Sequence, residues 1–101
     1  MPHFVMLFRA PHPLTPEDLQ RRAPLIRDWI DKVTSMGIAL SPRNLVAASA
    51  ENRQPADPAL VTMVFFDAAT WEQAEHVARL HPGPSYGTHL ELREWRPPVP
   101  A

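Results

Sequence analysis

Side chains able to take part in catalysis or ligand binding are concentrated between residues 81 and 91, namely His81, Tyr86, His89 and Glu91. Histidine changes charge near neutral pH and is suited to proton transfer, so His81 is our candidate catalytic residue. The alternative is that His81, which precedes a proline, ends a helix and interacts as a cation with the helix dipole. Tyr86 could donate a hydrogen bond to a ligand oxygen, or pack its ring beneath the loop that carries it.

The other candidates for ligand binding are His89, Glu91, Arg9 and Trp29. His89 and Glu91 would share one face of a strand, because side chains two residues apart on a strand point the same way. That face could hold a polar ligand, or Glu91 could pair with Arg93 across a subunit boundary. Arg9 ends an apolar run, and its guanidinium could bind a ligand carboxylate, face solvent or meet a second subunit. Trp29 either lines a cleft or belongs to the core.

A helix is predicted over residues 16–36, because Thr15 is a good N-cap, Pro16 suits the first turn and Gly37 is a typical stop. Pro24 removes a hydrogen bond inside this helix, so we expect a kink or a fresh start there. Apolar residues at steps of three and four predict one buried face, made of Leu19, Ala23, Ile26, Ile30 and Val33.

Three apolar runs, at 3–8, 60–66 and 88–95, predict strands. The run at 60–66 is apolar on both faces and should lie in the middle of a sheet. A weaker strand is expected within 38–48, interrupted at 41–44, and residues 51–58 are expected to form a loop. A capping box at 70–73 predicts a second helix that ends before Pro82.

The resulting order β-α-β-β-α-β predicts an α+β, ferredoxin-like sandwich. We expect a single domain over residues 1–96, followed by a Pro-rich tail at 97–101. The helices would cover one face of the sheet and leave apolar side chains on the other. Pairing with a second copy is the simplest way to cover that face, so we predict a homodimer that a charge at Val61 or Met63 would disrupt.

The composition excludes several classes of function. A net charge of −1 gives no broad attraction to nucleic acid or to an anionic membrane, and we expect neither as a partner. The chain has no cysteine, which excludes thiolate chemistry and is compatible with a cytoplasmic location. Zinc-protease histidine spacing, phosphate loops and nucleotide fingerprints are absent, so we predict neither a metal nor a cofactor.

The segment 60–95 carries a more specific pattern. Asp67 precedes a helix containing Glu and Ala, the dipeptide His81-Pro82 follows, Gly87 lies five residues after that proline, and the last strand reads Leu90-Glu91-Leu92-Arg93. This pattern resembles the YCII-related family of small dimeric α+β barrel proteins, and the N-terminal half fits more loosely. The resemblance implies a homodimer formed through the sheet face and a cleft in each subunit.

Two departures from that family affect the expected chemistry. Family members thought to be enzymes combine a histidine just after an R-P element on the first helix with an aspartate at the D-P position. Here no histidine follows Pro24 closely, and His81 replaces the aspartate. The His/Asp pair of the family therefore cannot be carried over to this chain.

The leading expectation is a domain with a cleft near His81, Tyr86 and His89 for a small polar or anionic organic molecule. If the domain is catalytic, the resemblance implies cofactor-free acid/base chemistry of an isomerase, lyase or hydrolase type. His81 would then move the proton, and Arg9 or Tyr86 would orient an oxygen. The alternative is a non-catalytic ligand-binding or dimeric accessory protein, which the missing His/Asp pair favours. A role in binding haem or flavin is supported by the fold alone, and a fold by itself is a poor guide to function.

Overall fold

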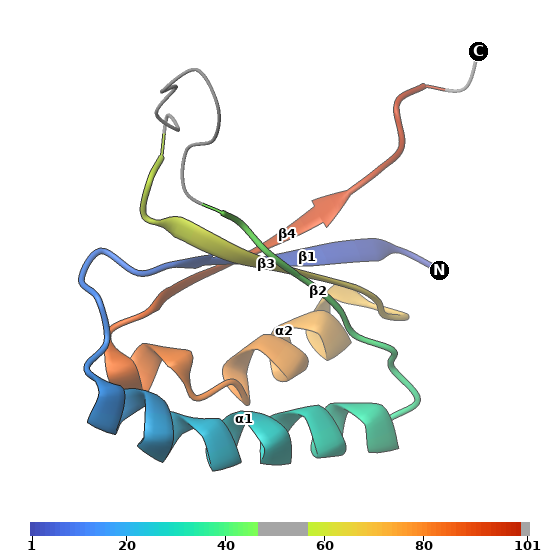
Figure 1. The fold of residues 1–101 in the computed structure, drawn as a ribbon. Coiled ribbons are helices and arrows are strands. Elements are labelled where there is room, and N and C mark those ends of the chain that lie inside the picture. The colour runs from blue at the N-terminus through green and yellow to red at the C-terminus, as the bar shows by residue number, and fades with distance from the viewer. Residues whose placement is uncertain (47–56, 100–101) are drawn as a thin grey trace.

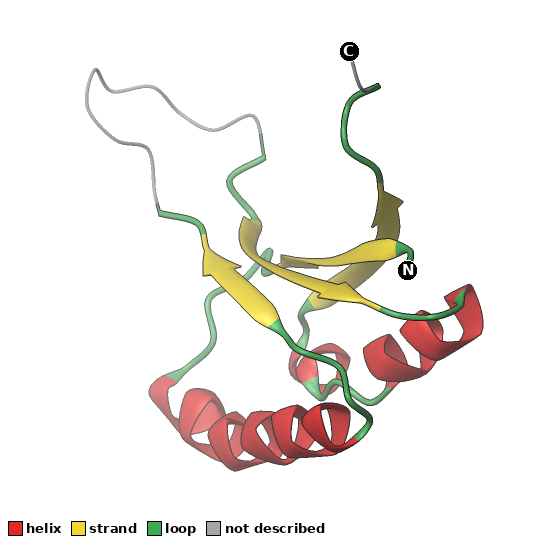
Figure 2. Cartoon of the chain, turned by 90° about the vertical axis from the view of Figure 1, so that its right-hand side faces the viewer, coloured by secondary structure: helices red, strands yellow, loops and turns green. Residues whose placement is uncertain are grey.

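The computed structural model describes residues 1–46 and 57–99 and shows an α+β fold with both helices on one face of a four-stranded sheet (Figures 1 and 2). The strands lie in the order β2-β3-β1-β4, and every pair is antiparallel. This is the ferredoxin-like arrangement of dimeric α+β barrel proteins, as the sequence predicts. The elements in chain order are β1 (His3–Arg9), α1 (Pro16–Ser35), β2 (Ser41–Asn44), β3 (Leu60–Asp67), α2 (Trp71–Arg79), the 3-10 helix η2 (Gly83–Tyr86) and β4 (His89–Trp95).

Helix α1 begins and ends where its capping residues predict. The Thr15 side chain accepts a hydrogen bond from the Asp18 backbone N–H at 3.1 Å, and Gly37 follows the last turn with φ of 82°. No new helix starts at Pro24, because α1 runs without a break from residue 16 to residue 35. Pro24 is exposed, and the kink expected there stays a prediction.

Helix α2 is held at its start by the predicted cap. The Thr70 hydroxyl accepts a hydrogen bond from the Gln73 backbone N–H at 3.1 Å. The Gln73 side chain reaches back to the N–H of Ala69, one residue before the position that a standard capping box uses. Ala74 and Val77 are the fully buried side chains of this helix, and they face the sheet.

Strand β2 corrects one expectation. The strand forms over 41–44, the segment expected to interrupt it, and Pro42 pairs with Val64 of β3. β2 is an edge strand, and proline is tolerated at an edge because one side of the strand needs no hydrogen-bond donors. β3 lies between β2 and β1, as its two apolar faces predict.

The sheet separates two different environments. Phe4, Met6 and Phe8 point from β1 toward the helices and form the core with buried residues of β3, α1 and α2. Val5 and Leu7 lie on the opposite, open face, aligned with Phe65 and Met63 of β3. The core therefore occupies one side of the sheet, and the open face carries a separate set of partly exposed apolar side chains.

The expected loop at 51–58 and the end of the expected Pro-rich tail lie largely outside the described residues. In the part of the chain that the structure describes, no helix has both the length and the apolar character needed to cross a membrane. Residues 1–46 and 57–99 also contain no group of three or more His, Asp or Glu side chains able to hold a metal ion.

Candidate functional site

A cavity of about 560 Å³ lies between α1, strands β1 to β3 and the chain from His81 to Thr88. This volume is in the range of pockets that hold small organic ligands. The predicted apolar stripe of α1 forms one wall through Leu19, Ile26 and Ile30. Leu19 and Ile30 remain 46% and 41% exposed, because they face this open cavity instead of a packed core.

His81 is the polar residue held most firmly in the cavity wall. Its ring packs at 4.6 Å between centroids against both Phe8 and Trp29, with the Trp29 ring edge-on. Its Nδ1 accepts a hydrogen bond from the backbone N–H of Gly83 at 2.9 Å. The imidazole is thus fixed by two aromatic neighbours and one backbone donor, which leaves it little freedom to rotate.

These contacts fix the protonation of His81. Nδ1 accepts a hydrogen bond, so in the neutral ring the proton is assigned to Nε2. Burial, and secondarily the positive charge of Arg22, lowers the pKa of His81 from 6.5 to about 4. The ring is therefore neutral at pH 7. The lowered pKa and the hydrogen bond that Nδ1 accepts from Gly83 favour a neutral ring over the alternative of a cationic histidine that caps α2.

The Nε2–H of His81 is available to a ligand. It has no partner among the described residues, and in that part of the chain no side-chain nitrogen or oxygen is both fully buried and unpaired. Nε2 is therefore not fully buried, and its residue is part of the cavity wall. A neutral imidazole N–H that meets a cavity can donate a hydrogen bond to a ligand oxygen.

No carboxylate supports His81 among residues 1–46 and 57–99. The one hydrogen bond of its ring there comes from the Gly83 N–H, and its pKa is shifted by burial and Arg22 without any acidic group. Glu91 instead binds Arg9 and Arg93. The arrangement favours a hydrogen-bond donor over a histidine activated as a base.

Trp29 serves the structure and the cavity together. Its indole N–H donates to the carbonyl of Val77 at 2.9 Å, which ties α1 to α2. One edge of the ring meets His81, and the side chain is 4% exposed. Both expectations for Trp29 are met, because it belongs to the core and also forms part of the cavity wall.

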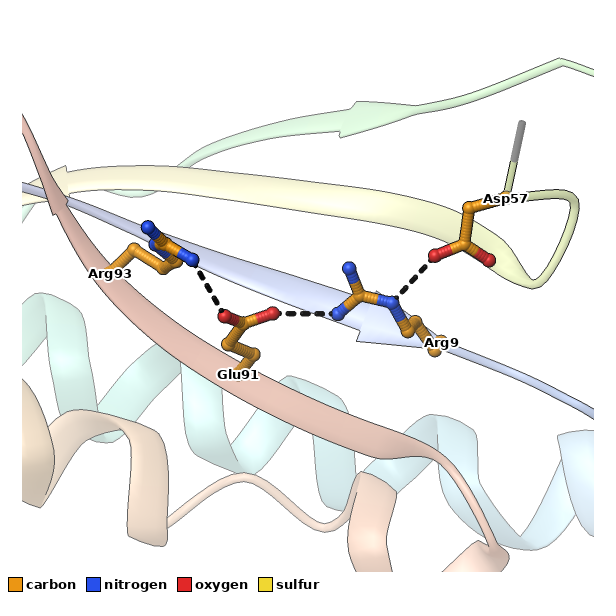
Figure 3. Close-up of polar contacts among 4 residues, drawn as sticks. All are labelled: Arg9, Asp57, Glu91 and Arg93. Atoms are coloured by element: carbon orange, nitrogen blue, oxygen red, sulfur yellow. Dashed lines mark hydrogen bonds and ion pairs between the residues drawn. The ribbon is translucent and has the colours of Figure 1, made fainter. Parts of the chain in front are cut away.

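Arg9 and Glu91 lie on the open face of the sheet, away from His81. Phe8 points toward the helices, so its neighbour Arg9 points the other way. Arg9 binds Asp57 and Glu91, each at 2.8 Å, and Arg93 binds the other oxygen of Glu91 at 3.1 Å (Figure 3). The Glu91–Arg93 pair therefore forms within one chain, where a pair across subunits was considered.

The positive and negative side chains of this open-face cluster stabilise one another's charged forms. Hydrogen bonds from Arg9 lower the pKa of Asp57 and of Glu91, and those carboxylates raise the pKa of Arg9. His89, opposite Arg9 in the register of β1 and β4, is exposed on the same face. Arg9, Glu91 and His89 are thus brought together, but not with His81.

Tyr86 ends η2 and is partly exposed, and it is not among the residues that line the cavity. Several residues of the site escaped the sequence reasoning. Arg22, Asn44 and Thr88 line the cavity, and the Gly83 N–H donates to His81. Arg22 carried a usable signal, since it lies four residues before Ile26 and seven before Trp29 and so shares their helix face. Thr88 and Gly83 carried none.

Comparison with known proteins identifies the fold and no family. No family model matches the chain, and no curated protein matches it significantly. Among solved structures, 5-chloro-2-hydroxyhydroquinone dehydrochlorinase (TftG) from Burkholderia phenoliruptrix AC1100, in complex with 2,5-dihydroxybenzoquinone, aligns over 93% of both chains with TM-score 0.53 and 12% identity. The protein At3g17210 from Arabidopsis thaliana aligns over 100% of this chain and 99% of its own, with TM-score 0.60 and 14% identity. At these identities the similarity shows a shared fold.

Proposed function

We propose that this protein binds a small polar or anionic organic molecule in the cavity beneath its sheet, with His81 as the main polar contact. The observation that carries the proposal is an imidazole held by Gly83 in the wall of a largely apolar cavity, with an Nε2 that is neither fully buried nor bonded to a described residue. Such pockets use a few placed polar groups to orient a ligand that their apolar walls desolvate. TftG, of the same fold, is described as a dehydrochlorinase bound to a small quinone, which agrees with a small-molecule site.

If the protein is an enzyme, the geometry supports cofactor-free chemistry in which His81 donates to an oxygen that gains negative charge. Isomerisation, elimination and hydrolysis can each place negative charge on an oxygen of the substrate when it carries a carbonyl or phenol group. A neutral histidine with a depressed pKa can perform this role, because its N–H is a donor that need not ionise. Proton shuttling by His81, the role that the sequence suggested, would have to proceed without a neighbouring carboxylate.

A second candidate function is ligand binding without catalysis, as in an accessory protein. The observation that favours it is the lack of an acidic partner for His81 among the described residues. A donor with no proton acceptor beside it can orient a ligand, but it lacks the second group that proton-transfer enzymes usually employ. Turnover of any ligand that binds would decide between the two candidates.

The binding proposal is tested by NMR titration of the histidines with a panel of small phenols, carboxylic acids and carbonyl compounds. A ligand in the cavity should shift the His81 resonances. His81→Phe, which keeps an aromatic ring between Phe8 and Trp29, should weaken binding by at least roughly tenfold. His76→Phe is the matched control, since His76 is exposed on α2 and outside the cavity. Equal affinity, or full activity on a substrate found later, in the His81 variant would refute the proposal.

The proposal includes a homodimer formed through the open face of the sheet. Leu7, Met63 and Phe65 are partly exposed there, and they lie beside the Arg9–Glu91–Arg93 cluster that would border an interface. A second copy would cover apolar side chains that the helices cannot reach. The expected cytoplasmic location belongs to the same proposal and rests on the sequence.

The dimer is tested with Met63→Glu, which places a charge at the centre of this face and should give a monomer or an aggregate. Val61, the other position that the sequence suggested, lies at the β3 irregularity and lines the cavity, so it does not test the open face. Leu25→Glu is the control, because Leu25 is 43% exposed on α1 and does not line the cavity. Sedimentation should show a dimer for the parent and the control, and a dimeric Met63 variant would contradict the interface.

A further inference from the structure

We infer that the cavity selects an organic monoanion with an apolar body, whose charged oxygen is bound by Arg22 beside His81. This inference rests on the proposed function, because it concerns the ligand of the same cavity. It adds the sign and number of the ligand charges and a residue that the sequence reasoning did not single out. A carboxylate and a phenolate share the required chemistry, namely an oxyanion attached to an apolar framework.

The first observation concerns the charged side chains of the cavity wall. Arg22 is the one charged side chain among the described residues that line the cavity, and no Asp or Glu of those residues lines it. Arg22 also forms no ion pair or hydrogen bond with an acidic side chain in residues 1–46 and 57–99. By contrast, Arg9 on the open face binds two carboxylates. Among the described residues, therefore, no acidic side chain competes with an external anion for this guanidinium.

The uncharged polar groups of the wall point to the same class of ligand. His81 offers Nε2–H, as its bond from Gly83 dictates. The Asn44 carboxamide oxygen accepts a hydrogen bond from the Thr62 hydroxyl at 3.2 Å, which leaves the amide N–H groups of Asn44 as donors. A wall that mainly donates suits a ligand rich in acceptor oxygens, and it disfavours an amine or other cation.

The apolar walls limit the ligand to one charge. Ile26, Trp29 and Val64 line the same cavity, and such surroundings cannot stabilise a charge that lacks a partner. A monoanion pairs with Arg22 and keeps its apolar body against these side chains. A dianion would leave a second charge without a counter-ion, so the cavity should reject it.

The test compares ligands that differ in charge but little in shape. Benzoate, cinnamate and 1-naphthoate are each paired with the neutral amide, and affinity is measured by NMR titration with the His81 resonances as the site marker. 4-Nitrophenol, measured above and below its own pKa, supplies the phenolate arm, and phthalate supplies a dianion. Arg22→Gln is compared with Arg27→Gln, since Arg27 is exposed on the same helix and outside the cavity.

We expect at least one anion to bind the parent protein roughly tenfold or more tightly than its neutral partner, because a charged hydrogen bond is worth more than a neutral one. This preference should disappear in Arg22→Gln and persist in Arg27→Gln. Equal binding of the anion and the neutral partner, a preference that survives in Arg22→Gln, or tighter binding of phthalate would overturn the inference. In those cases the proposed function survives, whereas failure of every neutral and anionic probe to shift His81 would overturn both.

Discussion

The contact between Gly83 and His81 gives the sharpest test of the site, because a single methyl group disturbs it. A Cβ atom added at Gly83 would lie 2.9 Å from Nδ1 and 3.1 Å from Cε1 of His81. Separations this short require one group to move. The imidazole has little room to do so, since Phe8 and Trp29 hold it on two sides. Gly83→Ala should therefore displace the ring and lengthen or break its hydrogen bond with the Gly83 N–H.

The stability of Gly83→Ala should fall. The added methyl group overpacks the site, which costs about 1–3 kcal/mol, and the lost hydrogen bond costs about 0.5–1.5 kcal/mol more. Replacing a glycine whose φ is not positive gains about 0.4–1 kcal/mol through the unfolded state and offsets part of this loss. The effect that identifies the contact should appear at the site, as a changed tautomer balance of His81 and weaker binding of any cavity ligand.

Gly87→Ala in the same loop is the matched control, because it should lose stability without disturbing His81. Gly87 has φ of 79°, and an added Cβ would meet nothing within 4 Å. A residue with a side chain is strained in this conformation by about 1–2 kcal/mol, so this variant should lose stability while His81 keeps its environment. Urea unfolding measures the first quantity, and the ¹⁵N shifts of the His81 ring nitrogens measure the second. If Gly83→Ala leaves the ring nitrogens unchanged, the account of the site is refuted.

Three further predictions concern pH, Trp29 and the open face. His81 takes up a proton below about pH 6.5 in the unfolded chain but only near pH 4 in the folded chain. The free energy of unfolding should therefore fall by up to about 1.4 kcal/mol per pH unit as the pH drops through that window. His81→Phe should flatten this slope, which urea unfolding measures. Trp29→Phe leaves the Val77 carbonyl without its donor and should cost about 1–3 kcal/mol, against a smaller cost for the more exposed Trp71→Phe; an equal cost would contradict the buried bond. Glu91→Gln should leave cavity binding unchanged, and weakened binding would show that the two faces are coupled.

Most of the fold could be predicted because its signals are local. The Thr15 and Thr70 caps, the stop at Gly37 and the alternation of β4 each depend on a few neighbouring residues. Strand β2 was misplaced because its existence depends on pairing with β3, and the sequence around Pro42 argues against a strand. Pairing across the chain supplies backbone hydrogen bonds that local propensity does not report.

The site was predicted less well, for a physical reason. An apolar stripe on a helix indicates a face turned away from water, but it does not separate a packed core from the wall of a cavity. Leu19 and Ile30 therefore read as core residues. The position of Arg9 and Glu91 on the open face could have been predicted, because the alternation that turns Phe8 and Leu90 toward the helices turns Arg9 and Glu91 away from them. The tautomer of His81 could not be predicted, since it depends on the position of Gly83 in the folded chain.

The charged groups on the two faces of the sheet are paired differently, and this contrast favours a candidate site between the helices and the sheet. On the open face each arginine of the cluster meets a carboxylate, so the group is nearly neutral as a whole and has little charge left to offer a ligand. In the cavity, His81 is kept neutral by burial and Arg22 meets no acid among the described residues. Apolar surroundings make such unpaired donors costly unless an anion or water satisfies them. The cavity therefore has donors that a ligand anion can pair with, whereas the charged groups of the open-face cluster already pair with one another.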